Sequence, residues 1–256
     1  MKKIIEAKVV KQVEIGPQVY KTEVYVPELA SITLPGQFAQ LKVKGAQQPL
    51  LRRPISVADV DGDAKTLTFI YKVLGEGTQA LSLVQVGEYL DIVGPLGNGF
   101  NLTAKKPLLV GGGLGIAPLI YLSRVFCGLN TEVLLAGRSA QELFWQDLFT
   151  ASCKQIHITT DDGSLGVQGN ALALLPELLA SGKYDAVYTC GPVKMMQGVA
   201  KLAIEQGIPC QVSLEKYMAC GIGACLSCSC ATKSGKRVKV CTDGPVFPAE
   251  EVIEWD

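Results

Sequence analysis

Residues 108–118 read LLVGGGLGIAP, and they are the strongest indication of how the second half of the chain folds. An apolar strand runs into a glycine-rich loop, and a helix pattern containing Pro118 follows. Such a turn leaves backbone N–H groups free at the positive end of the helix dipole, where a pyrophosphate can bind. The loop departs from the G-x-G-x-x-G dinucleotide pattern, and a glycine-rich turn that only serves tight packing stays an alternative.

Downstream of this loop, apolar runs of strand length alternate with helical patterns, which predicts a parallel sheet. The expected strands are Pro107–Val110, Thr131–Ala136, Gln155–Thr159 and Tyr184–Thr189. The expected helices are Ala117–Cys127, Ala140–Leu148, Ala171–Ala180 and Val193–Gln206. Ligands of parallel sheets bind at the carboxyl ends of the strands. Cys190-Gly191-Pro192 follows the last expected strand, so we expect it to face the same crevice as the glycine-rich loop.

Upstream, residues 1 to about 100 run in short alternating stretches, which predicts a compact antiparallel barrel. The clearest stretches are Ala7–Ile15, Gln37–Val43 and Thr66–Val73. The segment Leu51-Arg-Arg-Pro-Ile-Ser-Val57 places two guanidinium groups beside a hydroxyl, which suits an anionic pyrophosphate. Gly75-Glu-Gly-Thr78 opens a short helix and offers a second anion site. Read singly, each segment is more often a solvated basic pair or an ordinary turn.

The tail carries four cysteines with the spacing Cys-x4-Cys-x2-Cys and a fourth after twelve residues, namely Cys220, Cys225, Cys228 and Cys241. This is the plant-type arrangement that holds a [2Fe–2S] cluster. Zinc is the competing ligand, but structural zinc sites usually come as two separated Cys-x2-Cys pairs. Buried core cysteines are the other alternative. Cys230 offers a spare thiol and is expected to be a neighbour of the cluster that does not bind it. After these cysteines, one more short strand is expected at Arg237–Val240.

The composition predicts a protein of a reducing compartment. Nine cysteines are an odd number, so a complete disulfide framework is excluded, and a chain of 256 residues does not need one. The start, MKKIIEAK, lacks the apolar core of a signal peptide, and no apolar run reaches membrane-spanning length. The 24 basic and 24 acidic residues balance, which favours neither nucleic acid nor an anionic membrane as a partner. We expect a cytoplasmic protein.

Five motifs stand in a characteristic order along the chain. They are Arg53-Pro-Ile-Ser56, Gly75-x-Gly-Thr78, Gly94-Pro-Leu-Gly-Asn-Gly-Phe100, Gly111-Gly-Gly-x-Gly-x-Ala-Pro118 and Cys190-Gly-Pro192. In this order they resemble the motifs of the ferredoxin–NADP reductase superfamily. The tail from Glu215 to Cys228, followed by Cys241-Thr-Asp-Gly-Pro-Val-Phe247, is similar to the electron-transfer subunits of NAD-dependent (type B) dihydroorotate dehydrogenases. The likeness covers essentially the whole chain.

The resemblance implies three cofactor regions: an FAD-binding β-barrel over residues 1–101, a Rossmann-like NAD-binding α/β domain over 102–208 and a [2Fe–2S] segment over 209–256. The implied FAD contacts are Arg53 on the diphosphate, Ser56 near the flavin N5, and Pro54, Ile55, Ile70, Tyr71, Lys72, Gly77 and Thr78. The implied NAD contacts are Gly111, Gly112, Gly113, Gly115, Asp161, Cys190, Gly191 and Pro192. The implied cluster ligands are Cys220, Cys225, Cys228 and Cys241.

The resemblance also implies a function in de novo pyrimidine (UMP) biosynthesis. Electrons from dihydroorotate would reduce FMN in a separate catalytic subunit and pass singly through the cluster to FAD. They would leave as hydride to NAD+, because a flavin can convert single electrons into pairs. The expected assembly is a heterotetramer of two plus two chains. No residue of this chain is needed for dihydroorotate oxidation, and the single histidine, His157, is expected in the packed core.

Two details of the family pattern need separate expectations. In NADP-dependent relatives a Ser-Arg pair grips the 2′-phosphate, whereas Thr160-Asp161 stands at the corresponding strand end here. An anionic side chain repels a phosphate and accepts from a ribose hydroxyl, so we predict NAD(H) over NADP(H). Asp161 and Asp162 could instead only make a turn, and Arg138 could attract a phosphate. The terminal aromatic residue that shields the flavin in single-chain ferredoxin reductases has no obvious match, so the group that covers the ring is left open.

Three alternatives share part of these features. The nearest is the NAD-binding flavin and iron–sulfur subunit of an electron-bifurcating ferredoxin oxidoreductase or a hydrogenase. A second is a self-contained reductase that acts on a soluble ferredoxin. A third, of another class, is a zinc-stabilised binding module without redox function. The partner protein and the bound metal separate these alternatives.

Overall fold

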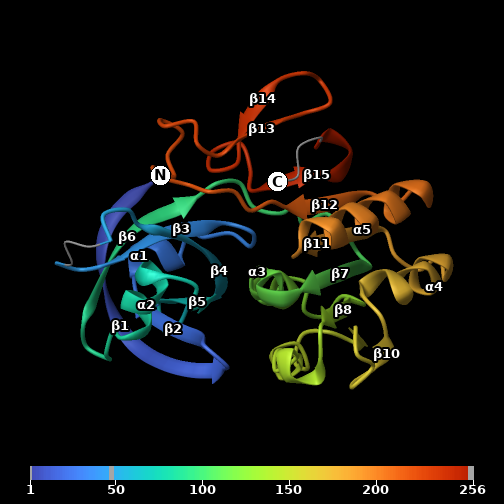
Figure 1. Cartoon of the computed structure of the whole chain (residues 1–256), viewed down its shortest axis with the longest axis horizontal. Helices are drawn as coiled ribbons and strands as arrows, with labels where there is room; N and C mark the ends of the chain where they lie inside the picture. The colour runs from blue at the N-terminus through green and yellow to red at the C-terminus, as the bar shows by residue number, and fades with distance from the viewer. Residues whose placement is uncertain (1, 46–48, 253–256) are drawn as a thin grey trace.

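The structure, a computed structural model, describes residues 2–45 and 49–252. A barrel, an α/β layer structure and an irregular cysteine-rich segment are visible in Figure 1. The barrel strands are β1 (Lys3–Gly16), β2 (Val19–Tyr25), β3 (Phe38–Val43), β4 (Arg53–Asp61), β5 (Thr66–Lys72) and β6 (Tyr89–Leu96). They close in the order β1-β2-β5-β4-β3-β6, and every pairing is antiparallel. The expected antiparallel barrel is confirmed.

Strand β1 closes the barrel because it is long enough to pair on both sides. Its residues from Lys3 to Lys8 pair with β6, and those from Lys8 to Gly16 pair with β2. Register shifts along the β1–β2 ladder mark bulges, which bend a strand and increase its twist. Two short helices connect the barrel strands, α1 (Pro27–Ala30) and α2 (Glu76–Ser82). Helix α2 is the short helix expected after Gly75.

The second sheet has the strand order β10-β9-β8-β7-β11-β12-β15. Its strands are β7 (Pro107–Gly112), β8 (Glu132–Gly137), β9 (Gln155–Thr160), β10 (Val167–Gln168), β11 (Ala186–Cys190), β12 (Cys210–Ser213) and β15 (Val246–Pro248). All neighbours are parallel except β15, which runs antiparallel to β12. The four strands expected here are confirmed. From β7 the chain builds outward first to β8 and β9 and then to β11 and β12, so the topological switch point lies between β7 and β11.

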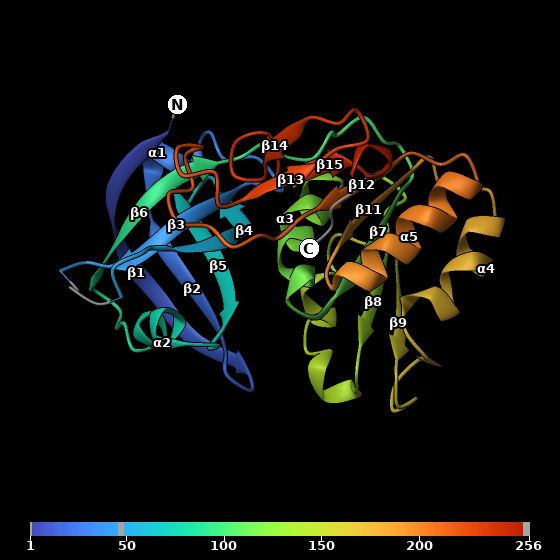
Figure 2. The same cartoon turned by 45° about the horizontal axis from the view of Figure 1, so that its top comes forward.

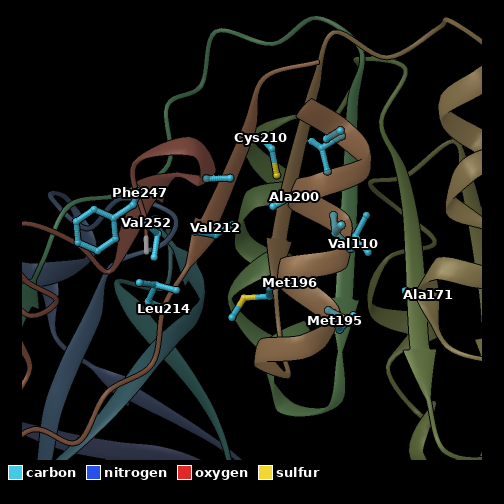
Figure 3. Close-up of a cluster of buried hydrophobic side chains, with 14 of the residues drawn as sticks. Val110, Ala171, Met195, Met196, Ala200, Cys210, Val212, Leu214, Phe247 and Val252 are labelled. Carbon is cyan, nitrogen blue, oxygen red and sulfur yellow. The ribbon is translucent and has the colours of Figure 1, made fainter. Parts of the chain in front are cut away.

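The helices of this sheet are α3 (Ala117–Val125), α4 (Leu175–Ala180) and α5 (Val193–Glu205), with the 3-10 turn η1 (Gly113–Ile116) before α3. Each face of the sheet has its own buried cluster of side chains. On β7, Leu108 and Val110 join the cluster under α4 and α5, whereas Leu109 joins the cluster around α3. Figure 3 shows Val110 beside α5, and Met195, Met196 and Ala200 of that helix belong to the same cluster. Strands buried on both faces are continuous apolar runs, as the sequence of β7 is.

One expected helix, Ala140–Leu148, is wrong. The segment forms two 3-10 turns instead, η2 (Ala140–Glu142) and η3 (Gln146–Leu148). Leu143 and Trp145 between them are both buried, yet residues two apart point to opposite sides of an α-helix. The chain can bury both only by leaving the helical path.

The expected helix Ala171–Ala180 is divided. It begins as the 3-10 turn η4 (Ala171–Ala173) and continues as α4 from Leu175. Pro176 stands in the first turn of α4. Proline has no N–H to bond the carbonyl four residues earlier, and its ring clashes with that carbonyl, so a helix begins at this point instead of running through it.

The tail belongs partly to the second sheet, which the sequence did not indicate. Strands β12 and β15 form its edge, and the chain between them carries the cysteines together with the hairpin of β13 (Ser229–Ala231) and β14 (Arg237–Lys239). Strand β14 matches the expected strand at residues 237–240. After β15 the described chain ends with the turn η5 (Ala249–Glu251). Figure 2 shows this segment, coloured red, lying across the junction of barrel and sheet. The domain limits 1–101, 102–208 and 209–256 remain a prediction.

Barrel and sheet are joined by direct contacts of α3 with β4 and with the segment between α1 and β3. Arg124 Nη1 lies 2.6 Å from Asp59 Oδ2, and the Tyr121 hydroxyl donates to the Thr33 carbonyl at 3.1 Å. Burial raises the pKa of Asp59, and the neighbouring Arg124 opposes this shift. In the described part of the chain, no helix is both long enough and apolar enough to cross a membrane.

A buried carboxylate, Glu132, ties together the amino ends of the sheet strands. It accepts hydrogen bonds from His157 Nε2 (2.7 Å), Lys183 Nζ (2.9 Å) and the Tyr184 hydroxyl (2.7 Å). Burial alone raises the pKa of Glu132, but these three partners outweigh it and hold the pKa at about 2. His157 therefore lies in the packed strand β9, as expected, and has a structural partner.

We predict that Glu132→Gln destabilises the protein by about 3 kcal/mol at pH 7, because a 1.36 kcal/mol contribution accompanies each pKa unit. A carboxyl whose folded pKa is depressed contributes stability above its unfolded pKa, near 4.5, and loses it as the pH falls towards 2. Urea unfolding between pH 7 and pH 3 measures both effects. Glu205→Gln is the matched control, since Glu205 makes only an exposed 3.9 Å pair with Lys201. Equal effects of the two variants would contradict the prediction.

Candidate functional site

Two cavities adjoin each other between the barrel and the sheet. The smaller, of about 430 Å³, lies against β4, β5 and the start of α2. The larger, of about 740 Å³, lies at the switch point of the sheet. Both are lined by Lys72 at the end of β5 and by Leu114 in the glycine-rich loop. A ligand in one cavity can therefore touch a ligand in the other.

The smaller cavity contains every residue expected to bind FAD. Its lining includes Arg53, Pro54, Ile55, Ser56, Ile70, Tyr71, Lys72, Gly77 and Thr78. The two barrel motifs meet here, because a Cβ added to Gly77 would lie 2.0 Å from Arg53 Nε. Glycine thus lets the backbone of α2 approach the guanidinium closely. The Arg53 Nη1 group donates to the Leu51 carbonyl at 2.8 Å, which orients the side chain. A cation beside the first turn of a helix suits a diphosphate.

The other members of these motifs have structural roles. Arg52 turns away and makes a two-pronged pair with Asp91 of β6, at 3.2 and 2.7 Å. Only Arg53 of the two arginines therefore faces the cavity. The Thr78 hydroxyl accepts from the backbone N–H groups of Leu74 (2.9 Å) and Gly75 (3.2 Å) and fixes the turn into α2. The Tyr71 ring is buried in the barrel, so its part in the cavity wall is small.

One wall of this cavity comes from the tail, which the sequence did not indicate. The lining residues there are Ser213, Leu214, Glu215, Lys216, Met218 and Pro245. Glu215 stays accessible through the cavity, yet the protein around it raises the pKa of its carboxyl by desolvation. Glu215 lies two residues after Ser213, the last residue of β12, and this place at a strand end is a signal that could have indicated this wall.

At the switch point the two glycine loops touch, as expected. A Cβ on Gly115 would lie 2.4 Å from the Gly191 nitrogen, and one on Gly112 would lie 2.7 Å from Met195 Sδ. The larger cavity above them is lined by Gly112, Gly113, Asp161 and Pro192 of the expected NAD contacts. Gly111, Gly115, Cys190 and Gly191 lie beneath its floor and are not part of the lining. The Cys190 thiol is buried, and burial raises its pKa well above the ordinary value.

Charges at the far end of this cavity are arranged in pairs. Arg138 donates from Nε to Glu142 Oε1 at 2.8 Å, and Asp162 accepts from the backbone N–H (2.9 Å) and hydroxyl (2.6 Å) of Ser164. Asp161 lines the cavity beside Arg138. The Asp161 carboxylate is therefore placed to meet a ligand, whereas the Arg138 guanidinium is already paired with Glu142.

The cysteine loop forms a cradle of backbone donors around one thiol. Cys220 Sγ accepts from the N–H groups of Ile222 (3.5 Å), Ala224 (3.3 Å) and Cys225 (3.4 Å). Gly221 and Gly223 both have positive φ, which turns these N–H groups inward. The Ser227 hydroxyl lies 3.2 Å from Cys225 Sγ and lowers the pKa of that thiol to about 6. Donors aimed at sulfur stabilise thiolates that bind iron.

The four thiols form two neighbouring pairs. The Cys225 N–H donates to Cys220 Sγ at 3.4 Å, and the Cys228 thiol lies beside that of Cys241. Burial and the Cys228 thiol raise the pKa of Cys241 to about 12. Among the described residues, no three His, Cys, Asp or Glu side chains converge on a point that suits a single metal ion. The cysteine spacing and the backbone donors around Cys220 fit a [2Fe–2S] centre held by thiolates. Cys230 is buried beside them in the hydrophobic cluster.

The motif around Asn98 holds the last cysteine in place. Asn98 Nδ2 donates to the carbonyls of Thr242 (3.3 Å) and Asp243 (2.9 Å), directly after Cys241. The Asn98 N–H donates to the Gly244 carbonyl at 2.6 Å. The barrel motif Gly94–Phe100 thus anchors the cysteine segment, a role that its sequence alone did not suggest.

Comparisons with known proteins agree with this site. Residues 215–253 match the model of the iron-sulfur cluster binding domain of dihydroorotate dehydrogenase B. The dihydroorotate dehydrogenase B (NAD(+)) electron transfer subunit of Enterococcus faecalis is 41% identical over 96% of both chains. That of Desulforamulus reducens is 34% identical over the whole of both.

Solved structures share the fold. A structure described as that of the NADH-dependent reduced ferredoxin-NADP oxidoreductase, an electron-bifurcating protein, superposes with a TM-score of 0.86 at 33% identity, over 97% of this chain and 90% of the other. A ferredoxin NADP+ reductase from Neisseria gonorrhoeae with bound FAD and NADP has a TM-score of 0.64 at 18% identity, over 80% and 92%. Identity above a third along the full length, with the cysteine segment included, decides the family: the chain belongs to the electron transfer subunits of dihydroorotate dehydrogenase B (NAD(+)).

Proposed function

We propose that this chain carries electrons from the FMN of a dihydroorotate dehydrogenase catalytic subunit through a [2Fe–2S] cluster and FAD to NAD+, in de novo pyrimidine biosynthesis. The observation that carries the proposal is that the three regions adjoin one another. The two cavities share Lys72 and Leu114, and the tail forms one wall of the smaller cavity. The tail residues that line the smaller cavity lead directly into Cys220. When bound, the cluster supplies one-electron transfer and FAD supplies the conversion between single electrons and hydride.

The chain's own residues would hold FAD in the smaller cavity. Arg53 would bind the diphosphate, and Gly77 would let the backbone approach it. Ser56 on the cavity wall would lie at the ring, and the segment 213–218 would cover the ring in place of a terminal aromatic residue. Tyr217 in that segment points away, since its exposed fraction is 96%.

The same geometry supports a nicotinamide site at the switch point. Gly112, Gly113 and Pro192 would form its floor, Gly111, Gly115, Cys190 and Gly191 would support that floor from beneath, and Asp161 would meet the ribose. Because both cavities include Lys72 and Leu114, the nicotinamide end can reach the flavin. Hydride transfer needs this direct approach, with water excluded. The buried Cys190 thiol is suited to packing rather than to proton transfer at neutral pH.

The catalytic partner would dock on the cysteine loop. Ile222 and Leu226 lie beside the cluster ligands and expose 50% and 60% of their surface, and Tyr217 is nearly free of contacts. Met218 packs against the hydrophobic cluster instead, so it is not part of this surface. An apolar surface around a redox centre can exclude water from the path between two subunits. We propose an assembly of two plus two chains. We place it in the cytoplasm, because the ligand thiols must stay reduced until iron is inserted.

A second candidate function has one specific observation in its favour. The electron-bifurcating oxidoreductase described above superposes over nearly the whole chain, so the same fold can serve another partner. The match of residues 215–253 to the dihydroorotate dehydrogenase B cluster domain and the 41% identical relative favour the first candidate. The flavoprotein that co-purifies with the native chain would decide between them.

We predict that Gly77→Ala lowers the affinity for FAD about tenfold or more, since the new methyl group displaces the Arg53 guanidinium and loses a charge-assisted hydrogen bond. FAD titration followed by fluorescence measures this. Gly62→Ala is the matched control, because no atom lies within 4 Å of its added Cβ and the residue lies outside both cavities. The fold should survive, since only a flexible side chain must move. Similar affinities of the two variants would refute the assigned role of Arg53.

We predict at least about a tenfold preference for NADH over NADPH in kcat/KM, because Asp161 accepts from a ribose hydroxyl and repels a phosphate. Asp161→Ser should reduce this preference by raising the NADPH value. Asp162→Asn is the control, since that carboxylate is already bonded to Ser164. Comparable kcat/KM for both cofactors in the unmodified protein would show that Asp161 does not select.

We predict that the isolated chain contains FAD and two irons and reduces artificial acceptors from NADH, but does not oxidise dihydroorotate. The FMN-containing subunit should restore that activity. Zinc without iron in metal analysis, or dihydroorotate oxidation by this chain alone, would sink the proposal.

The docking surface has its own variant in the same experiment. Leu226→Asp should weaken subunit binding about tenfold by placing a charge in an apolar contact. Leu226 has φ of 63°, which Asp adopts more readily than Leu, so the loop should keep its fold and its iron. Leu83→Asp, at a leucine of similar exposure beyond α2, should leave subunit affinity unchanged.

A further inference from the structure

Gln40 on β3 is a fully buried amide without a hydrogen-bond partner. Its exposed fraction is 1%, and neither Nε2 nor Oε1 has a partner in the described structure. Buried polar groups are almost always bonded, so an amide with both ends unsatisfied calls for an explanation. Strands β3, β4 and β6 offer none, because their backbone groups pair with each other in the ladder.

The amide points out of the barrel. Its neighbours along β3, Ala39 and Leu41, belong to the cluster of side chains inside the barrel. Because side chains alternate along a strand, Gln40 lies on the outer face. Phe38 shares that face and packs in the cluster that contains Cys228 and Cys241. Gln40 therefore faces the cysteine segment.

The cysteine loop lies directly on the amide. A Cβ added to Gly221 would be 2.7 Å from Gln40 Nε2 and 2.8 Å from its Cγ. Gly221 follows Cys220, the thiol that already accepts three backbone N–H groups from its own loop. Across the ladder Gln40 pairs with Pro54, which lines the smaller cavity. The amide thus stands between the proposed flavin wall and the proposed cluster ligands.

We propose that Gln40 is a positioning residue for the cluster, and that its Nε2 donates a hydrogen bond to a cluster sulfur, either the Cys220 thiolate or an inorganic sulfide. The inference rests on the cluster proposed above. A donor to sulfur stabilises the reduced, more negative cluster and raises its reduction potential. The orphaned amide and the glycine at position 221 are explained together, since any side chain there would separate the amide from the loop.

The test compares cluster potentials in the full chain loaded with FAD and iron. Gln40→Leu keeps the approximate volume and removes the donor, so the one-electron equilibrium should shift about tenfold against the reduced cluster, or about 59 mV more negative. The g-values of the reduced cluster should change as well. Thr159→Val is the matched control, because Thr159 Oγ1 is also buried without a partner but lies on β9, away from the cysteines. Its potential and g-values should equal those of the unmodified protein.

If Gln40 had only a structural role, its replacement would change the free energy of unfolding and leave the potential and g-values of the cluster unchanged. Gln40→Leu with two irons, an unaltered potential and unaltered g-values would overturn the inference. If that variant does not load iron, the unmodified chain decides: with 15N in glutamine side-chain amides, pulsed EPR of the reduced cluster should show a 15N coupling, and its absence would refute the bond. A chain that binds no iron at all would overturn the proposed function itself, which is a different result.

Discussion

The relative position of the three parts depends on one buried cluster of apolar side chains. Phe38, Val93 and Leu96 come from the outer face of the barrel, and Cys228 and Cys241 from the tail. The same cluster continues under α4 and α5 to the parallel sheet, as Phe247, Leu214 and Val212 show in Figure 3. Apolar packing is dense and resists sliding. The cluster contacts all three parts. Neither cavity can therefore shift relative to the cysteine loop unless the packing of this cluster is opened.

The polar contacts between the parts add a fixed orientation to this apolar packing. The Asp59–Arg124 pair joins the barrel to the sheet, and the bonds from Asn98 join the barrel to the tail. Each is modest in energy, but each fixes a direction that apolar packing leaves free. A two-electron site and a one-electron site must face each other at defined separation for electrons to pass in order. Packing sets the separation, and the directional bonds set the orientation.

The sequence indicated those features that depend on local pattern. The apolar run before Gly111, the alternation of the barrel strands and the cysteine spacing all have short-range signals, and the corresponding elements are present. The helix expected at 140–148 was wrong because Leu143 and Trp145 are both drawn into the core from one segment. The Arg-Pro-Ile-Ser motif singled out Arg53 only through the family resemblance, and what turns Arg52 away is its partner Asp91 on β6, distant in sequence. The cavity wall at Glu215 and the contact of Gln40 with the cysteine loop both form between the barrel and the tail. These segments are far apart in sequence, so no local pattern encodes the contacts.

The ladder between β12 and β15 closes the cysteine segment at its base. Ser213 pairs with Val246, and the Leu214 N–H donates to the Pro245 carbonyl at 2.9 Å. In topological terms, residues 214–245 are an insertion between two adjacent strands of a sheet that is otherwise complete. The entropy of closing such a loop grows only with the logarithm of its length, so its content can change at little thermodynamic cost to the body. A flavin reductase could thus have acquired or exchanged its electron-transfer module by lengthening a single hairpin, while the nucleotide-binding body kept its strand order.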